Sequence, residues 1–334
     1  MAWITKQFRS LDAFRRRRRS LLAAYVSPSA AALACQGGEA DGTEQVTLRA
    51  DRLGDPSELG AVLRRQLSSF GLRQADVRLI LAPDFYKLLL VETPAVPEAE
   101  VNEALRWQLQ DGAEFDMADA AIDSFPLPPA AARGTPMSFA VAAPNAELRR
   151  LVHVAEGAGL RIGAVDVLEL SLRNLIFRLF DSPDQALGVL RLTTSGGVFS
   201  LSRGDQLFLA RRLNGVPAEQ DGEAWTGFRE RLLVQIQRSV DYYESTLGQP
   251  PASGLFVAAT DDREADIIRF LRDMLPFPVR SLPAELCRLL DLELHNPQPA
   301  LLDTDTLTEV DRKAVAAALP ALGGVFPVLA GESA

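Results

Sequence analysis

The chain has 334 residues, of which 47% are hydrophobic and 24% are charged, and it contains two cysteines and two histidines. This composition excludes global disorder, a coiled-coil or collagen-like protein and a disulfide scaffold. It also leaves too few cysteines and histidines for a zinc cluster, and the length is sufficient for two or three compact units.

The first 20 residues differ from the rest of the chain in charge. Residues 1–19 contain seven basic residues and one acidic residue, although the whole chain has a net charge of −9. Apolar residues near helical spacing precede a run of arginines; they are Trp3, Ile4 and Phe8, followed by Arg15, Arg16, Arg17, Arg18 and Arg19. This pattern predicts a basic amphipathic arm that contacts an anionic membrane surface. A solvated arm and a nucleic-acid contact confined to the arm are the alternatives, and the acidic body excludes nucleic acid as the main partner.

In the first half of the chain, strands and helices alternate. Apolar and alternating runs predict strands over 21–26, 30–35, 45–50, 77–81, 86–92, 120–125, 137–143 and 162–168. Helical spacing predicts helices over 55–70, 97–110, 145–157 and 170–180. Asp55 with Pro56 is expected to begin the first of these helices, and Asn145 to cap the third.

The second half repeats the alternation. Strands are predicted over 187–193, 198–202, 206–213, 255–259 and 278–282. A stripe of large apolar residues from Trp225 to Leu247 predicts the longest helix, which Gly248 and Pro250 end; further helices are predicted over 264–275 and 312–319. Pro320 and the pair Gly323–Gly324 are expected to stop the last helix, and they argue against a spanning helix in the uncharged run 314–331.

Residues 21–82 and 187–260 share one layout: a strand, a hairpin strand, a third strand, then a helix and a strand. The repeat predicts an α/β protein with two similar lobes and a cleft between them. This layout resembles that of the actin-like ATPase (ribonuclease H-like) fold, which is the fold we expect.

Local residues resemble the PilM family of type IV pilus assembly proteins, and within it MshI of mannose-sensitive haemagglutinin (MSHA) pilus biogenesis. The matching features are Trp107, Phe115–Asp116 and Asp123 within 104–128, Ala158–Leu160 followed by Val165–Val167, and the helix segment Gln237–Glu244. The resemblance covers residues 21–330. It implies a first lobe over 21–82, 145–185 and 311–334, an inserted subdomain over 83–144, and a second lobe over 186–310.

In this fold two hairpin turns present Asp and Gly to the phosphates and Mg²⁺ of a nucleotide. The corresponding residues here are Tyr25, Ser27 and Ser29 in the first turn, and Arg191, Thr193, Thr194 and Ser195 in the second. Tyr25 and Arg191 replace the two aspartates, so the resemblance implies a degenerate cleft with no catalytic residue, no metal and no cofactor. Gly196, Gly197, Asn214 and Gly215 are further candidates for holding an anion. An ATP- and Mg²⁺-binding cleft is the alternative.

The resemblance further implies a cytoplasmic scaffold at the inner face of the bacterial inner membrane. It would take the N-terminal tail of a PilN-like or MSHA-type membrane partner into a groove beside the inserted subdomain, and Phe85, Leu88 and Trp107 are candidates for exposed residues of the groove wall. An active ATPase that regulates partner binding is one alternative. The cytoplasmic domain of a type II secretion platform protein is another.

Overall fold

A computed structural model describes residues 21–38, 44–110, 115–131, 134–180, 184–194, 196–217, 222–289, 292–294 and 309–325. The predicted basic arm, with Trp3, Ile4, Phe8 and Arg15 to Arg19, lies outside the described residues, as does Ser195.

The first lobe is built on a six-stranded sheet with the order β14-β3-β2-β1-β4-β8. Its strands are β1 (Leu21–Val26), β2 (Ala30–Gly38), β3 (Glu44–Arg52), β4 (Ala75–Leu81), β8 (Leu160–Val167) and β14 (Leu292–Leu294). β1 and β2 form an antiparallel hairpin, and β1 runs parallel to β4. Because β14 pairs with β3, the chain is already back in the first sheet at residue 292, and the predicted second-lobe boundary at 310 is too late.

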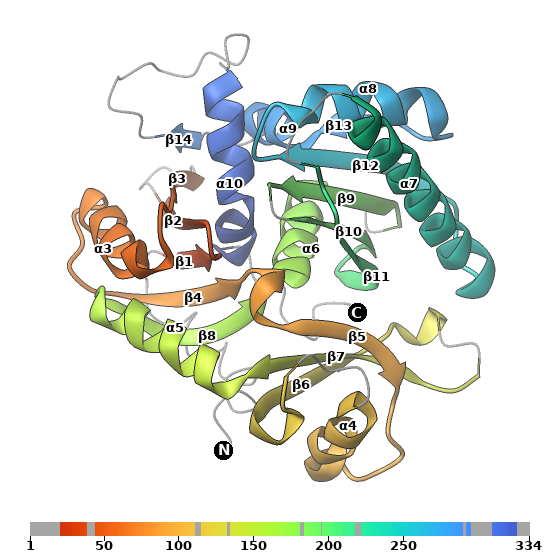
Figure 1. The fold of residues 1–334 in the computed structure, drawn as a ribbon, viewed down its shortest axis with the longest axis horizontal. Coiled ribbons are helices and arrows are strands. Elements are labelled where there is room, and N and C mark those ends of the chain that lie inside the picture. Colours follow the sequence, from red (N-terminus) through yellow and green to blue (C-terminus); the bar gives the residue numbers. More distant parts are fainter. Residues whose placement is uncertain are drawn as a thin grey trace.

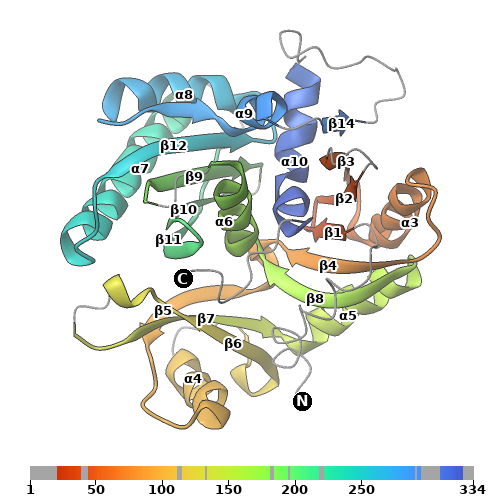
Figure 2. The same cartoon turned by 180° about the vertical axis from the view of Figure 1, so that it is seen from behind.

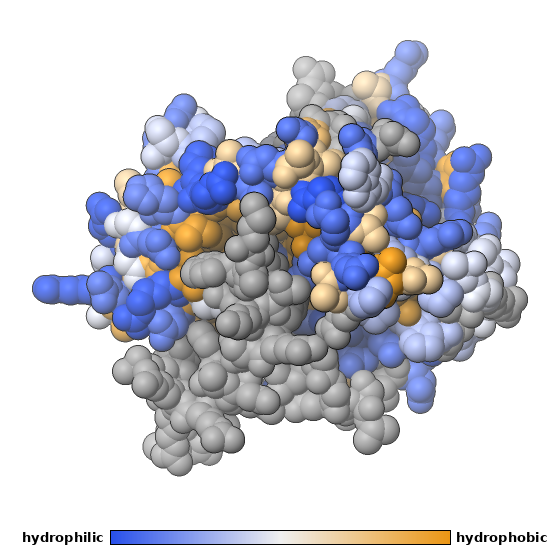
Figure 3. All heavy atoms as spheres, turned by 90° about the horizontal axis from the view of Figure 1, so that it is seen from below, coloured by the Kyte–Doolittle hydropathy of each residue, from blue (hydrophilic) through white to orange (hydrophobic). Residues whose placement is uncertain are grey.

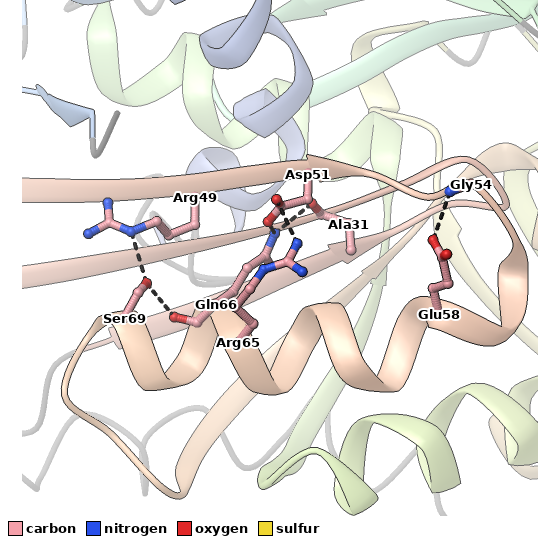
Figure 4. Close-up of polar contacts among 8 residues, drawn as sticks. All are labelled: Ala31, Arg49, Asp51, Gly54, Glu58, Arg65, Gln66 and Ser69. Atoms are coloured by element: carbon pink, nitrogen blue, oxygen red, sulfur yellow. Dashed lines mark hydrogen bonds and ion pairs between the residues drawn. The ribbon is translucent and has the colours of Figure 1, made fainter. Parts of the chain in front are cut away.

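The helix that follows the first hairpin begins as predicted. Asp55 caps the turn Pro56–Glu58 by accepting a hydrogen bond from the Ser57 amide at 2.8 Å, and α3 (Leu59–Ser69) continues from it. The Gln66 side chain anchors this helix to the sheet by donating to the Ala31 carbonyl at 2.9 Å (Figure 4).

The second lobe repeats the arrangement of the first, with the strand order β11-β10-β9-β12-β13. Its strands are β9 (Ala186–Thr193), β10 (Gly196–Arg203), β11 (Gln206–Leu213), β12 (Ala252–Ala259) and β13 (Val279–Ser281). Its helices are α7 (Gly222–Asp241), α8 (Arg263–Met274) and α9 (Leu282–Leu289), of which α9 was not predicted. As in the first lobe, the hairpin strand β9 is antiparallel to β10 and parallel to β12. The duplication predicted from the sequence is therefore present.

The predicted long helix ends in a π-helical turn (Tyr242–Thr246) before Gly248, whose φ is +64°. Tyr243 of this turn is buried and meets the Phe208 ring edge-on, with 5.4 Å between the ring centres. This contact ties the end of the helix to the second sheet.

A small subdomain is inserted between β4 and α5 (Asn145–Gly157). It contains the antiparallel sheet β5-β7-β6 and the α-helix α4; these elements are β5 (Lys87–Glu92), α4 (Val101–Leu109), β6 (Ala120–Pro126) and β7 (Met137–Pro144). α4 covers the face of this sheet that points away from the two lobes (Figures 1 and 2). Asn145 does not cap α5 as predicted, because the cap position is Pro144 and the Asn145 amide donates to Asp119 instead.

Two helices, α6 (Leu168–Leu179) and α10 (Glu309–Val325), lie between the two large sheets (Figure 1). The prediction that α10 ends at Pro320 is wrong. Gly323 and Gly324 belong to the helix and allow a close approach, because a Cβ on Gly323 would lie 2.0 Å from the Ser171 carbonyl oxygen of α6. The Ser171 hydroxyl donates to the Pro320 carbonyl at 2.5 Å, which adds a polar contact at the same crossing.

None of the described helices combines the length and the apolar character that crossing a membrane requires. Seen from below, the described part of the surface is mostly hydrophilic, with hydrophobic residues in small groups (Figure 3).

Candidate functional site

A cavity of about 390 Å³ separates the two hairpins of the duplicated lobes. Its walls contain the predicted cleft residues of both turns, namely Tyr25, Ser27, Ser29, Arg191, Thr193, Thr194, Gly196 and Gly197. Asn214 lines a second cavity beside the inserted subdomain, and Gly215 lines neither. The residues predicted from the two turns therefore line one cavity, and Asn214 and Gly215 lie outside it.

The turn of the first hairpin uses its own hydrogen-bond donors. The Ser27 amide donates to the Ala30 carbonyl at 2.9 Å, and the Ser27 Oγ accepts from the Ala30 amide at 2.9 Å and from the Ser29 amide at 3.4 Å. Pro28 has no amide hydrogen. Each backbone N–H of the turn is thus engaged within it, whereas a phosphate-binding turn must direct such groups at the ligand.

The glycines of the second hairpin serve packing. A Cβ on Gly197 would lie 2.7 Å from Leu192 Cδ2 and 2.8 Å from the Arg191 carbonyl oxygen, so no larger residue fits between the strands. The Thr193 hydroxyl donates to the Gly196 carbonyl at 3.0 Å. Gly197 is therefore explained by the hairpin itself, without a ligand.

Arg191 is the unusual residue of the cleft. Its side chain lines the cavity, yet the residue is only 4% exposed, and Nε lies buried without an acceptor in the described part of the chain. Its nearest partner is Tyr25 across the cleft, whose hydroxyl accepts from Nη1 at 3.5 Å and whose ring centre lies 5.1 Å from the guanidinium carbon. Burial raises the pKa of the Tyr25 phenol, so this hydroxyl is neutral and keeps its hydrogen.

The charge of Arg191 is costly in this place. Removing an ion from water costs several kcal/mol unless a counter-charge and good hydrogen bonds replace the water, as a general order of magnitude. No carboxylate pairs with Arg191 among the described residues. A cation–π contact between desolvated groups contributes roughly 2 kcal/mol or somewhat more. The contact with Tyr25 therefore offsets only part of the cost.

Three further charged residues line the cleft and were not predicted from the sequence: Arg52, Asp84 and Arg212. Arg52, at the end of β3, donates to the Thr260 carbonyl of the second lobe at 3.2 Å. Arg212, on β11, donates to the Pro83 carbonyl at 2.5 Å and pairs with Asp84 at 3.3 Å. These contacts join the lobes across the cleft. No motif marks the three residues, because their proximity depends on how the lobes are placed.

The carboxylates of the cleft do not fit the Mg²⁺ site of a nucleotide-binding relative of this fold. Asp84 is paired with Arg212. Asp51 accepts from Arg65 and from Gln66 on α3, each at 2.8 Å (Figure 4). A Mg²⁺ site needs oxygen ligands that are free to face the metal and its waters. Within the described ranges no three potential metal ligands cluster anywhere, so no chemical step is assigned to a metal here.

A buried polar pair lies where the inserted subdomain begins. The Tyr86 hydroxyl donates to the Glu169 carboxylate at 2.5 Å and accepts from the Leu168 amide at 3.1 Å. Burial raises the pKa of the Glu169 carboxyl, although the hydrogen bond from Tyr86 opposes the shift. This pair holds the insert against the first turn of α6.

The residues predicted to form a partner groove do not share one wall. Phe85 is 8% exposed, so the expectation that it is exposed is wrong. Trp107 is 70% exposed on α4, whose Leu105 and Leu109 pack on the outer face of the small sheet. Leu88 is half-buried on the opposite face, toward the lobes. Packing of α4 by Leu105 and Leu109 necessarily directs Trp107 away from Leu88.

The three-dimensional arrangement matches solved structures along most of the chain. A chain of the PilM–PilN type IV pilus biogenesis complex superposes with a TM-score of 0.69 at 17% identity, covering 92% of this chain and 98% of that one. A protein from Bacteroides thetaiotaomicron, with an actin-like ATPase fold and unknown function, superposes with a TM-score of 0.51 at 12% identity over 84% and 98%. This chain has the actin-like ATPase fold.

Among further structures with this likeness is the cytoplasmic domain of EpsL, an inner-membrane component of the type II secretion system of Vibrio cholerae. Its TM-score is 0.48 at 12% identity, over 93% of this chain and 99% of that one. No protein-family model and no curated protein matches the sequence. The PilM–PilN chain and the Bacteroides protein confirm the actin-like fold that the duplicated layout predicts.

Proposed function

We propose that this chain is a cytoplasmic scaffold at the inner face of the bacterial inner membrane, in the assembly platform of a type IV or MSHA-type pilus. Its partner is a bitopic PilN-like membrane protein whose N-terminal tail lies against the inserted subdomain. The observation that carries the proposal is the match to a PilM–PilN chain over 92% of this chain.

The inner face of the small sheet supports a peptide site. Leu88, Val141 and Asp123 lie side by side across β5, β7 and β6 on the face that points toward the lobes. Oδ2 of Asp123 is buried without a donor in the described part of the chain, and burial raises the pKa of this carboxyl. A half-buried apolar residue beside an unsatisfied acceptor suits a tail with an apolar side chain and a backbone N–H donor.

The partner proposal is tested by fluorescence anisotropy. The probe is a labelled peptide with the N-terminal cytoplasmic segment of a PilN-like protein from the same organism. We expect saturable binding that Leu88→Ala and Asp123→Asn each weaken by about fivefold, the size typical of an interface residue worth about 1 kcal/mol. Trp107→Ala is the control in the same subdomain and leaves the affinity unchanged. Equal affinity of all three variants and the wild type contradicts this site, and no saturation with any PilN-like or MSHA-type tail contradicts the partner.

Within the same proposal the cleft is catalytically degenerate. Support comes from the occupied N–H groups of the first turn and from the pairing of Asp51 and Asp84 with arginines. The melting temperature with and without millimolar Mg-ATP tests this: a ligand at 100 times its dissociation constant adds ~2.7 kcal/mol of stability. We expect no Mg²⁺-dependent shift and no phosphate release. A Mg²⁺-dependent shift would support the alternative, an ATP-binding regulator.

A further inference from the structure

The charges that line the cleft do not balance. Its carboxylates are already paired, Asp51 with Arg65 and Asp84 with Arg212. Two of its arginines, Arg52 and Arg191, have no carboxylate within ion-pair distance in the described part of the chain. The cavity wall therefore holds two cations without a paired carboxylate, the buried Arg191 and the exposed Arg52.

The donors at this excess charge are of the kind that bind oxyanions. The Arg191 guanidinium lines the cavity, is nearly buried, and meets only the Tyr25 hydroxyl at the outer limit of hydrogen bonding. The Tyr25 hydroxyl accepts from Arg191, which leaves its own hydrogen available for an acceptor in the cavity. A guanidinium presents a planar set of donors that matches the oxygens of a phosphate. Arg52 belongs to the first lobe, across the cleft from Arg191, and its guanidinium donates to the uncharged Thr260 carbonyl.

We propose that this cleft binds a phosphate-type oxyanion without a metal ion, held by Arg191 and Tyr25 and counterbalanced further by Arg52. The anion supplies the counter-charge that Arg191 lacks among the described residues, and it contacts both lobes. Because Arg191 belongs to the second lobe and Tyr25 to the first, occupancy links the lobes. The inference concerns the cleft alone and holds whether or not the proposed membrane partner binds.

The test is a thermal-shift titration of the full chain with sodium pyrophosphate, and separately with inorganic phosphate, in a buffer with EDTA at constant ionic strength. We expect a saturable rise in melting temperature for the wild type. Arg191→Met is expected to weaken the apparent affinity at least tenfold, and Arg191→Lys and Tyr25→Phe by less. Arg280→Met, on β13 outside the cavity, is the matched control and retains the wild-type affinity.

Three outcomes would overturn the inference. The first is a wild-type chain that shows no saturable shift with either anion. The second is a shift of the same size in Arg191→Met, or in Arg191→Lys if the methionine variant does not fold. The third is a shift that appears only when Mg²⁺ is added, because the cleft would then be a metal-dependent nucleotide site. None of these results touches the binding of the membrane partner, which is measured with a different probe.

Discussion

In the first lobe, the strand that faces the cleft carries Tyr25, an uncharged residue, and the turn beyond it closes on its own hydrogen bonds. In the second lobe, the strand at the corresponding place in the duplicated layout carries Arg191, a buried cation without a counter-charge among the described residues. The two hairpins have the same strand arrangement, but one places an uncharged side chain at the cleft and the other a buried positive charge. A duplicated scaffold fixes where two side chains meet, but it does not fix what they do there.

The first prediction concerns α10, the helix that packs against the sheet of the first lobe. Gly323→Ala places a Cβ against the Ser171 backbone of α6, where neither side can move without unpacking the sheet. We expect a loss of about 3 kcal/mol or more in the free energy of unfolding, measured by urea denaturation. Gly157→Ala, at a helical glycine with open space around it, is the control and is expected to change stability by less than about 1 kcal/mol. Equal effects would mean that α10 does not approach α6 so closely.

The second lobe gives a prediction of opposite sign. Arg191→Met replaces an unpaired buried charge by an apolar side chain of similar length. We expect the anion-free protein to gain about 1–3 kcal/mol in stability, because no buried ion pair is broken and the desolvation cost disappears. Thermal melting in anion-free buffer measures the gain. A loss of similar size would show that the contact with Tyr25 stabilises the charge fully, and the two hairpins would then be a matched pair.

The buried pair of Tyr86 and Glu169 in the first lobe predicts how the free energy of unfolding changes with pH. The raised pKa of Glu169 means that the folded protein keeps a proton that the unfolded chain loses above ~4.3. This carboxyl therefore lowers stability as pH rises from that value to its folded pKa, by up to about 1.4 kcal/mol per pH unit. Glu169→Gln removes this dependence, so the stability of the variant minus that of the wild type should increase with pH across that window. Urea denaturation at several pH values measures the slope, and a slope of zero contradicts burial of the carboxyl.

The smallest effect is expected for Trp107 of the inserted subdomain, which has no counterpart in the second lobe. Trp107→Ala should change the free energy of unfolding by no more than about 0.5 kcal/mol, because the side chain is 70% exposed. Leu105→Ala, two residues earlier and fully buried, should cost about 2–5 kcal/mol. Thermal melting of both variants separates the two faces of α4. A large loss at Trp107 would mean that this face is covered.

Much of the fold could be predicted because periodicity and turn residues are local signals. The hairpin that contains Tyr25, the cap at Asp55 and the end of the long helix near Gly248 all follow from short stretches of chain. The predictions failed where a residue serves a distant neighbour. Pro320 and Gly323 were predicted to break the last helix. In the structure the Pro320 carbonyl accepts a hydrogen bond from Ser171, and Gly323 leaves room for the same residue, about 150 positions away. Asn145 read as a cap, but it reaches Asp119 instead.

In the cleft, too, local features could be predicted from the sequence and contacts between distant residues could not. The sequence alone predicted that the chain folds into two duplicated lobes, and the resemblance to the PilM family implied that Tyr25 and Arg191 replace the two aspartates of the cleft. Only the tertiary structure decided which charges are balanced. Arg52, Asp84 and Arg212 are ordinary surface residues in the sequence, and they reach the cleft because the lobes and the inserted subdomain converge there. A charge is compensated by whatever lies within a few ångströms of it, and that distance is set by packing between segments far apart in the chain.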